Sequence, residues 1–131
     1  MLAKPKILLA DDNRDLRELV LVFLKRVGFD VIEASTGSEA LSVAHAGHPD
    51  LILIDLILPE LCGDEVTARL KADPMTRDIA IIIASALPPS HHSVKRAIAH
   101  GAVDILAKPF TFKTLGETIR RYISPPQSLE Y

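Results

Sequence analysis

Five side chains with carboxyl, hydroxyl or amino groups stand directly after short apolar runs of this chain: Asp11, Asp12, Asp55, Ser85 and Lys108. The clearest case is Asp55, which interrupts the apolar run 51–59. An ionised aspartate in such a run is costly to bury unless it is paired, binds a metal ion or lies where the strand reaches the surface. Asp55 is therefore a functional candidate at the end of a strand, although an aspartate there can also simply cap the following turn.

A magnesium site is one chemistry that these residue types allow. If Asp11, Asp12 and Asp55 lie together, their carboxylates repel one another, and the pKa of at least one of them should rise. A bound cation would relieve this repulsion. Carboxylate oxygens at an open, hydrated site suit Mg²⁺ better than Ca²⁺, and zinc is disfavoured because no histidine or cysteine joins the cluster.

Phosphoryl transfer is the reaction that the same set of groups could perform. Asp55 could attack a phosphorus atom and become an acyl phosphate, while Lys108 and the metal ion neutralise charge on the transferring oxygens. The Ser85 hydroxyl could donate a hydrogen bond to another of these oxygens. The same groups would favour later hydrolysis of the acyl phosphate by water.

The elements that must position these groups alternate along the chain. Apolar runs without alternation predict strands buried on both faces, at residues 6–10, 29–34, 51–59, 79–84 and 103–107. Helical spacing predicts a helix after each strand, over about 14–27, 38–46, 64–72, 90–100 and 112–123, with Asn13, Ser90 and Thr111 as N-caps of the first, fourth and fifth. This order indicates an α/β fold with a parallel sheet covered on both faces. Ligands bind at the carboxyl ends of such strands, so the polar groups should meet at one edge.

The composition is that of one globular domain in a reducing compartment. The 131 residues include 17 acidic and 15 basic ones, which gives no electrostatic footprint for direct binding of nucleic acid or an anionic membrane. Cys62 is the only cysteine, and the N-terminus lacks the apolar core of a signal peptide. No apolar run approaches the roughly 20 residues of a membrane span. We expect a cytoplasmic protein, with residues 124–131 as a tail or the start of a linker.

In order along the chain, the polar groups resemble the motifs of receiver domains of two-component response regulators. The matching residues are Asp11-Asp12 after the first strand, Asp55 with Leu58-Pro59 and Gly63, Ser85-Ala86 after the fourth strand, and Lys108-Pro109-Phe110 after the fifth. Each short motif is weak alone, but the five-part set on these strands is highly specific. The resemblance covers about residues 5–123 and implies a receiver domain over 1–123.

This resemblance implies a flavodoxin-like (βα)5 fold with strand order 2-1-3-4-5. It also implies a magnesium site in which Asp12, Asp55 and the backbone carbonyl of Ile57 bind the ion directly and Asp11 acts through water. The phosphoryl group would come from a histidine kinase or a histidine phosphotransfer protein.

Lys108, Ser85 and the Ala86 amide would contact this phosphoryl group, and the Lys108–Pro109 bond would be cis. The protein would be a phosphoacceptor that assists its own phosphorylation and dephosphorylation rather than an enzyme. Its output would run through the face formed by the fourth helix, fifth strand and fifth helix, to an effector or a second copy.

Two features of the sequence bear on how the domain responds to phosphorylation and on how long its acyl phosphate lasts. Receivers usually carry an aromatic residue three positions before the lysine, whereas this chain has Ile105. Either a smaller aliphatic movement or the loop 85–93 reports phosphorylation, or Ile105 simply packs and the switch is weak. Ile57 and Leu87 flank the expected approach of hydrolytic water, and we predict that they lengthen the acyl-phosphate lifetime. Cys62 is expected to be an ordinary loop residue, since no basic neighbour lowers its pKa.

Three other functions fit the fold class less well. A flavin-binding module needs a phosphate loop rich in Ser, Thr and Gly after the first strand, where Asp11 and Asp12 would repel phosphate. An aspartyl phosphatase of the haloacid dehalogenase type needs a second acid two residues after its nucleophile, where this chain has Ile57. A receiver-like interaction scaffold that works without phosphorylation is the remaining alternative, and such a scaffold should be insensitive to Asp55→Asn.

Overall fold

The computed structural model describes residues 4–125 and has a single five-stranded parallel sheet. Its strands are β1 (Lys6–Ala10), β2 (Asp30–Ala34), β3 (Leu51–Asp55), β4 (Ala80–Ser85) and β5 (Asp104–Ala107). They lie in the order β2-β1-β3-β4-β5, with every neighbouring pair parallel. This arrangement confirms the expected flavodoxin-like α/β fold and its strand order.

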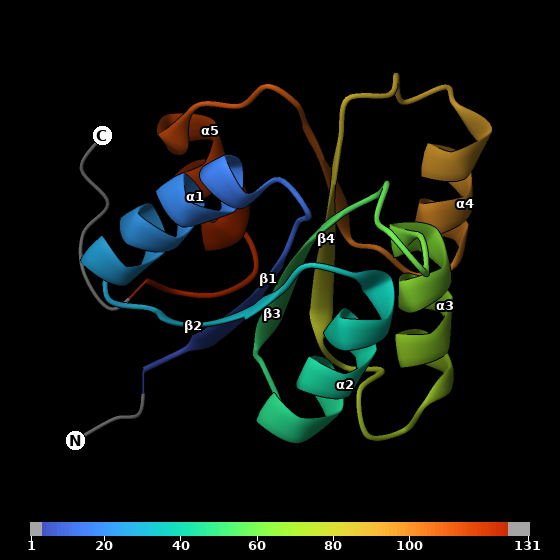
Figure 1. Ribbon diagram of the computed structural model, residues 1–131, viewed down its shortest axis with the longest axis horizontal. Helices are drawn as coiled ribbons and strands as arrows, with labels where there is room; N and C mark the ends of the chain where they lie inside the picture. Colours follow the sequence, from blue (N-terminus) through green and yellow to red (C-terminus); the bar gives the residue numbers. More distant parts are fainter. Residues whose placement is uncertain (1–3, 126–131) are drawn as a thin grey trace.

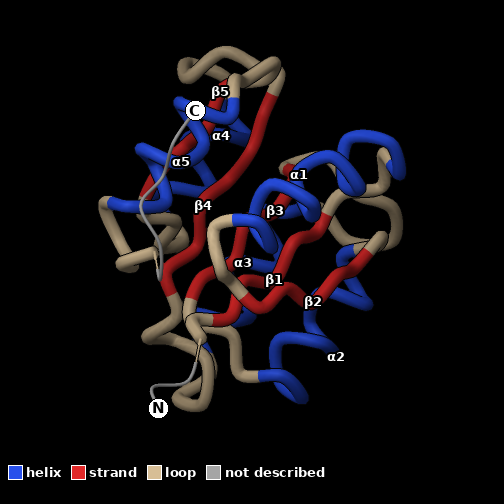
Figure 2. The backbone as a smooth tube through the Cα atoms, turned by 90° about the vertical axis from the view of Figure 1, so that its left-hand side faces the viewer, coloured by secondary structure: helices blue, strands red, loops and turns tan. Residues whose placement is uncertain are grey.

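Five helices cover the two faces of the sheet: α1 (Arg14–Arg26), α2 (Gly37–Gly47), α3 (Gly63–Ala72), α4 (His92–Ala99) and α5 (Phe112–Arg120). Figure 1 shows α1 and α5 on one side of the sheet and α2, α3 and α4 on the other, and Figure 2 shows the strands side by side between these layers. The strand–helix alternation of the sequence thus produces a three-layer domain.

Two apolar cores result, because successive side chains of a strand point to opposite faces. In β3, Ile52 and Ile54 pack toward α2, α3 and α4, whereas Leu51 and Leu53 pack toward α1 and α5. All four are at most 2% exposed. This double burial explains why the strand sequences are continuously apolar, and we call the first of these two clusters the α2–α4 core.

Side chains cap most helix starts as the sequence predicts, with one exception. Asn13 Oδ1 accepts a hydrogen bond from Leu16 N at 3.2 Å, and Thr111 Oγ1 accepts one from Thr114 N at 3.1 Å. The expected cap Ser90 is wrong, because α4 begins one residue later than that cap requires and His91 is its N-cap. His91 Nδ1 accepts a hydrogen bond from Ser93 N at 3.1 Å.

Two strand ends also differ from the sequence expectation. β3 stops at Asp55 instead of continuing to Pro59, because the chain turns there and Leu56 O accepts a hydrogen bond from Gly63 N at 2.7 Å. β4 runs one residue further than expected and includes Ser85. Both differences place a functional candidate at the last residue of its strand.

Within residues 4–125, no helix has the length and apolar character needed to cross a membrane. The boundary between a receiver domain at 1–123 and a tail at 124–131 stays a prediction. Residues 126–131 of that tail lie outside the described part of the chain.

Candidate functional site

The register of the sheet brings the predicted polar residues to one edge. Ala10 of β1 pairs with Ile54 of β3. Asp11 and Asp55 are the next residues after these two, so they leave the sheet side by side. Asp55 pairs with Ala84, the residue before Ser85 on β4. Because the strands are parallel, their carboxyl ends face the same way, and these residues converge.

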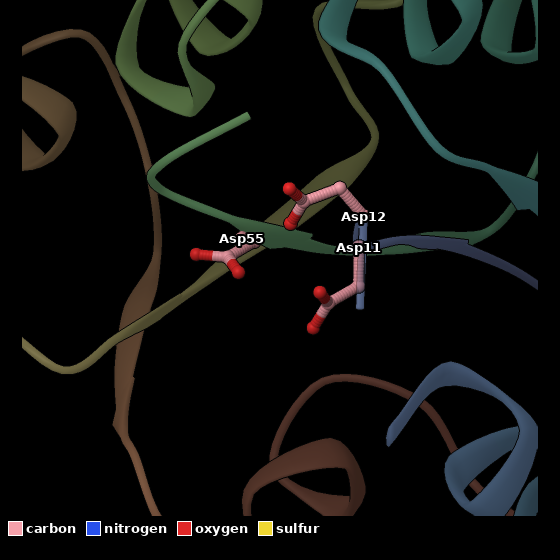
Figure 3. Close-up of side chains that lie close together, drawn as sticks. All are labelled: Asp11, Asp12 and Asp55. Carbon is pink, nitrogen blue, oxygen red and sulfur yellow. The ribbon is translucent and has the colours of Figure 1, made fainter. Parts of the chain in front are cut away.

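Three carboxylates gather where β1 and β3 end. Asp11, Asp12 and Asp55 each offer an oxygen atom, and these atoms lie within 4.8 Å of one another (Figure 3). The Asp11 side chain is buried and that of Asp12 is exposed, so the cluster opens to solvent on one side. Hard oxygen donors in this number fit a hydrated divalent cation such as Mg²⁺.

A single ammonium group balances part of this negative charge. Lys108 Nζ donates to Asp55 Oδ2 at 2.7 Å and to Asp11 Oδ2 at 3.0 Å. Its backbone N donates to Ser85 O at 2.8 Å, which ties the loop after β5 to the end of β4. The Lys108–Pro109 peptide bond is cis, as the resemblance implied.

Burial and charge act in opposite directions on the pKa values of both Asp55 and Lys108. Burial raises the pKa of Asp55 and outweighs the hydrogen bonds from Lys108 and Ile57 N, while the nearby Asp11 charge adds a smaller increase. The predicted direction is therefore confirmed, but burial rather than mutual repulsion is the main cause. The pKa of Lys108 is raised, because contacts with the two carboxylates outweigh the opposing effect of its burial.

Ser85 and Ile57 come close to Asp55 by different routes: Ser85 follows Ala84, the β4 residue paired with Asp55, and Ile57 lies two residues after Asp55 in the chain. The Ser85 side chain is buried, and its Oγ accepts a hydrogen bond from Leu87 N at 2.9 Å. Ile57 N donates to Asp55 Oδ1 at 3.1 Å, and the Ile57 side chain is 58% exposed. Leu87 is only partly buried and packs against the α2–α4 core, and Ala86 is exposed. Of these groups, Ile57 N contacts Asp55 directly, and the roles of all of them toward a phosphoryl group stay predictions.

Arg17 is a positioning residue that the sequence did not reveal. Its Nη1 donates to the backbone O of Asp11 at 2.6 Å, and its Nε donates to Glu33 Oε1 at 3.1 Å. Asp11 N in turn donates to Ala34 O at 3.1 Å. The backbone that presents the acid cluster is thus held from α1 and β2, and no motif in the sequence signals this role of Arg17.

Two glycines permit close backbone packing at the loop between β3 and α3. A Cβ atom at Gly63 would lie 2.5 Å from the Asp55 backbone O, and one at Gly37 would lie 1.8 Å from Leu61 O. Gly37 N donates to Pro59 O at 3.1 Å. These contacts fix the loop between β3 and α3, which carries Ile57.

Ile105 and Cys62 make ordinary contacts in this structure. Ile105 on β5 is partly buried and packs against the α2–α4 core. Cys62 is exposed and is the N-cap residue of α3, but its side chain makes no capping hydrogen bond.

A sequence model of the response regulator receiver domain matches residues 7–120 of this chain. The chain belongs to the response regulator receiver domain family. The match contains every residue of the candidate site and the whole sheet except Lys6, the first residue of β1.

Curated relatives of this receiver domain are transcriptional regulators. It is 36% identical over 123 residues to the phosphate regulon transcriptional regulatory protein PhoB of Escherichia coli, covering 92% of this chain and 53% of the relative. It is 37% identical over 117 residues to a probable transcriptional regulator, ycf27, of Porphyridium aerugineum, covering 89% of this chain and 47% of the relative. The chain spans about half the length of these relatives.

Solved structures of other receivers superpose closely on this domain. The Vibrio cholerae chemotaxis protein CheY4 gives a TM-score of 0.86 at 29% identity and covers 92% of this chain and 100% of its own. The receiver domain of a Pseudomonas aeruginosa sensor histidine kinase gives 0.83 at 29% identity, over 92% of this chain and 98% of its own. That structure holds a magnesium ion in its active site cleft.

Proposed function

We propose that this receiver domain accepts a phosphoryl group on Asp55 from a histidine kinase or a histidine phosphotransfer protein, with Mg²⁺ as cofactor. The observation that carries the proposal is the placement of Asp55 within an acid cluster and 2.7 Å from the Lys108 ammonium. A carboxylate needs this environment both to approach a phosphoryl group and to stabilise the charge that develops on it.

The transfer exchanges one bond for another. An oxygen of the Asp55 carboxylate forms a bond to phosphorus, the P–N bond of the phosphohistidine breaks, and its electron pair stays on the imidazole nitrogen. Lys108 binds an oxygen of the transferring group, and the Ser85 hydroxyl and the Ala86 amide bind another. Ile57 N, which donates to Asp55 Oδ1, keeps the carboxylate oriented during the approach.

The residues present fit a magnesium ion by their chemistry. Asp12, Asp55 and the Ile57 carbonyl would hold it directly, and Asp11 would act through water. When bound, the ion supplies positive charge next to the transferring oxygens. Lys108 alone offers one positive charge against three carboxylates, so a further cation would complete the balance at this edge of the sheet.

We propose that the domain is a phosphoacceptor and not an enzyme that turns over a separate substrate. The same groups that assist the attack of Asp55 also assist hydrolysis of its acyl phosphate by water, so the domain promotes its own phosphorylation and dephosphorylation.

We also propose that the protein is cytoplasmic, as expected from the sequence.

The output would run through the face formed by α4, β5 and α5. Ile98 on α4 and Val103 before β5 are exposed apolar residues on this side, 51% and 43% exposed. Arg121 is bound to Asp104 at 2.9 Å, which fastens α5 to β5. We propose that phosphorylation shifts this face to control an effector or a second copy, and that the domain itself does not bind nucleic acid.

The test is phosphorylation with a small donor. Wild-type protein is incubated with Mg²⁺ and acetyl phosphate, and its intact mass is compared with that of Asp55→Asn. We expect a phosphoryl adduct that requires both Asp55 and Mg²⁺, and a matching Mg²⁺-dependent binding of beryllofluoride. No adduct and no mimic binding in folded wild-type protein would contradict the proposal and favour the phosphorylation-independent scaffold.

A further inference from the structure

Two carboxylates are buried among residues 4–125, and only one of them belongs to the acid cluster. Asp11 is 6% exposed and lies in that cluster, whereas Asp64 is 5% exposed and lies in the first turn of α3. A buried carboxylate needs a charged or hydrogen-bonding partner. The α3 helix dipole favours an acid at this place, but the exposed Glu65 beside it serves the dipole equally well. The burial of Asp64 therefore needs another explanation.

Asp64 is held by α4, the helix that packs beside α3 in the same layer (Figure 1). Its Oδ2 lies 3.1 Å from Arg96 Nη1, and its backbone O lies 3.3 Å from His100 Nδ1. Arg96 and His100 are four residues apart, so they lie on the same face of the chain's fourth helix. Two residues at this face thus contact a single residue of α3.

The backbone joins Asp64 directly to the end of the strand that carries Asp55. Gly63 N donates to Leu56 O at 2.7 Å, and a Cβ atom at Gly63 would lie 2.5 Å from Asp55 O. Since no side chain lies between these backbone atoms, a shift of the chain at Asp55 and Leu56 displaces the start of α3. The connection therefore runs from Asp55 through Leu56 and Gly63 to Asp64, and from there to Arg96.

Other contacts between α4 and the loop after β3 are looser. A groove of about 290 Å³ lies between them, with Ile57 on the loop side and Ser93 and Arg96 on the α4 side. On β5, the Ile105 side chain makes apolar contacts with the α2–α4 core. Among residues 4–125, the Asp64–Arg96 pair is the ion pair that joins α3 to α4.

We propose that the Asp64–Arg96 pair couples the acceptor site to α4, so that phosphorylation of Asp55 changes the position of α4 through the start of α3. This inference rests on the proposed function, because it needs a phosphoryl group on Asp55. Asp64 and Arg96 are positioning residues, since both lie outside the acid cluster. Coupling is reciprocal, so the pair also makes binding at Asp55 depend on the free energy needed to move α4.

Hydrogen exchange of the α4 amides tests this coupling. It is measured by mass spectrometry on the full chain in Mg²⁺, with and without beryllofluoride. In wild type, the mimic should change the exchange rates of these amides several-fold. In Asp64→Asn and Arg96→Gln this change should fall to less than half, because α4 no longer follows the start of α3. Both variants should bind beryllofluoride at least as tightly as wild type, since binding no longer has to move α4.

Glu65→Gln is the matched control, because Glu65 is the neighbouring acid of α3 and pairs with Arg69 of the same helix at 3.2 Å. Its α4 response should equal that of wild type. Arg96→Lys should restore part of the response that Arg96→Gln loses, since an ammonium group can still pair with Asp64. Thermal unfolding checks that each variant is folded. The Arg96 side chain is 55% exposed, so its variants remove the pair without changing a buried residue.

Three results would overturn the coupling while leaving the proposed function intact. One is a wild type that binds beryllofluoride with no change in α4 exchange. Another is a full α4 response in both Asp64→Asn and Arg96→Gln. The third is loss of beryllofluoride binding in both folded variants, which would assign the pair to the acceptor site itself. A wild type that binds no beryllofluoride would overturn the proposed function and this inference together.

Discussion

At the residue scale, the surroundings of Asp55 suit the proposed phosphoryl transfer better than they suit a carboxylate that only stabilises the fold. Burial raises its pKa, because the ionised form is less well solvated here than in an exposed aspartate. Lys108 compensates by direct hydrogen bonds to Asp55 and Asp11. If Asp55 accepts a phosphoryl group as proposed, the Lys108 ammonium can bind a phosphoryl oxygen in place of the carboxylate, so that no buried charge is left unpaired.

Ile57 provides a test of how water reaches the acyl phosphate. Its side chain is 58% exposed and projects from the loop whose backbone N holds Asp55 Oδ1. Ile57→Asn should shorten the acyl-phosphate lifetime several-fold, because an amide can hold the attacking water that the apolar side chain excludes. Decay of the adduct after donor removal, followed by intact mass, measures this.

Ile98→Asn is the matched control for the Ile57 experiment, since Ile98 is 51% exposed and lies on α4. Its adduct should decay at the wild-type rate. Equal lifetimes in wild type and Ile57→Asn would show that Ile57 does not shield the acyl phosphate.

The residues of the acid cluster were predictable because parallel strands end at one edge. Once the first and third strands were assigned, we could predict that their following residues, Asp11, Asp12 and Asp55, lie close together. Arg17 was not predictable in this way, because its contact with the Asp11 backbone depends on the angle at which α1 crosses the sheet. The main cause of the raised Asp55 pKa also needed the structure, since sequence spacing says nothing about burial depth.

At the element scale, the loop between β3 and α3 depends on the absence of a side chain at Gly63. A Cβ atom there would lie 2.5 Å from Asp55 O and 3.0 Å from Leu56 Cα, and backbone atoms cannot move aside cheaply. Gly63→Ala should lower the free energy of unfolding by about 1–3 kcal/mol. It should also slow phosphorylation by acetyl phosphate, because it displaces the backbone that orients Asp55.

Gly47→Ala is the control for this experiment. At the end of α2, an added Cβ atom would meet only Ile32 Cδ1, the flexible end of a side chain, at 2.6 Å. Urea unfolding should therefore show a change near zero for Gly47→Ala, helped by the better helix propensity of alanine. An unchanged stability and reaction rate in Gly63→Ala would contradict the close-contact argument.

A second prediction at this scale concerns pH and the contact between α2 and the end of α3. His45 Nε2 lies 2.7 Å from Asp73 Oδ2, and this hydrogen bond raises the pKa of His45, with a second contribution from the Leu41 carbonyl. The resulting stability is present below the unfolded pKa of histidine, about 6.5, and is lost as pH rises through the higher folded value. The effect should be small because both side chains are largely exposed.

Unfolding of wild type and His45→Gln between pH 5 and 9 measures this contribution. The wild type should be the more stable protein at the acidic end, and the difference should shrink as pH rises. His92→Gln, an exposed histidine without an ion pair in the described part, should track the wild type throughout. A difference that grows with pH would have the wrong sign for a raised His45 pKa.

The elements themselves were largely predictable from apolar runs and helical spacing, and the misplacements have local causes. The apolar run 51–59 does not stop where β3 does, since Leu56 is buried in the turn and keeps the sequence apolar beyond the strand. Ser90 has the usual chemistry of an N-cap, but it lies inside a turn that His91 N closes by donating to Pro88 O at 2.9 Å, and His91 is the N-cap of α4 instead. Cap identity depends on this backbone path, which composition does not encode.

At the scale of the whole molecule, the sheet separates the proposed acceptor site from the proposed output face. The acid cluster lies at the carboxyl edge of the sheet, whereas α4 and α5 lie in opposite layers beside the edge strand β5 (Figure 1). The acid cluster joins the ends of β1 and β3, two central strands of the sheet, so the stability of the whole domain should report cation binding there.

Magnesium binding should be detectable as a rise in the thermal stability of the whole domain. A ligand that binds only the folded state stabilises it, by about 1.4 kcal/mol at ten times its Kd, which for a domain of this size raises Tm by roughly 4–7 °C. We expect such a rise on adding MgCl₂ to EDTA-treated protein, and a much smaller one in Asp12→Asn, which removes one charge from the exposed side of the cluster. NaCl at matched ionic strength controls for screening. An equal rise in NaCl, or in Asp12→Asn, would mean that Asp11, Asp12 and Asp55 do not form a specific cation site, since only coordination by these carboxylates distinguishes the two salts.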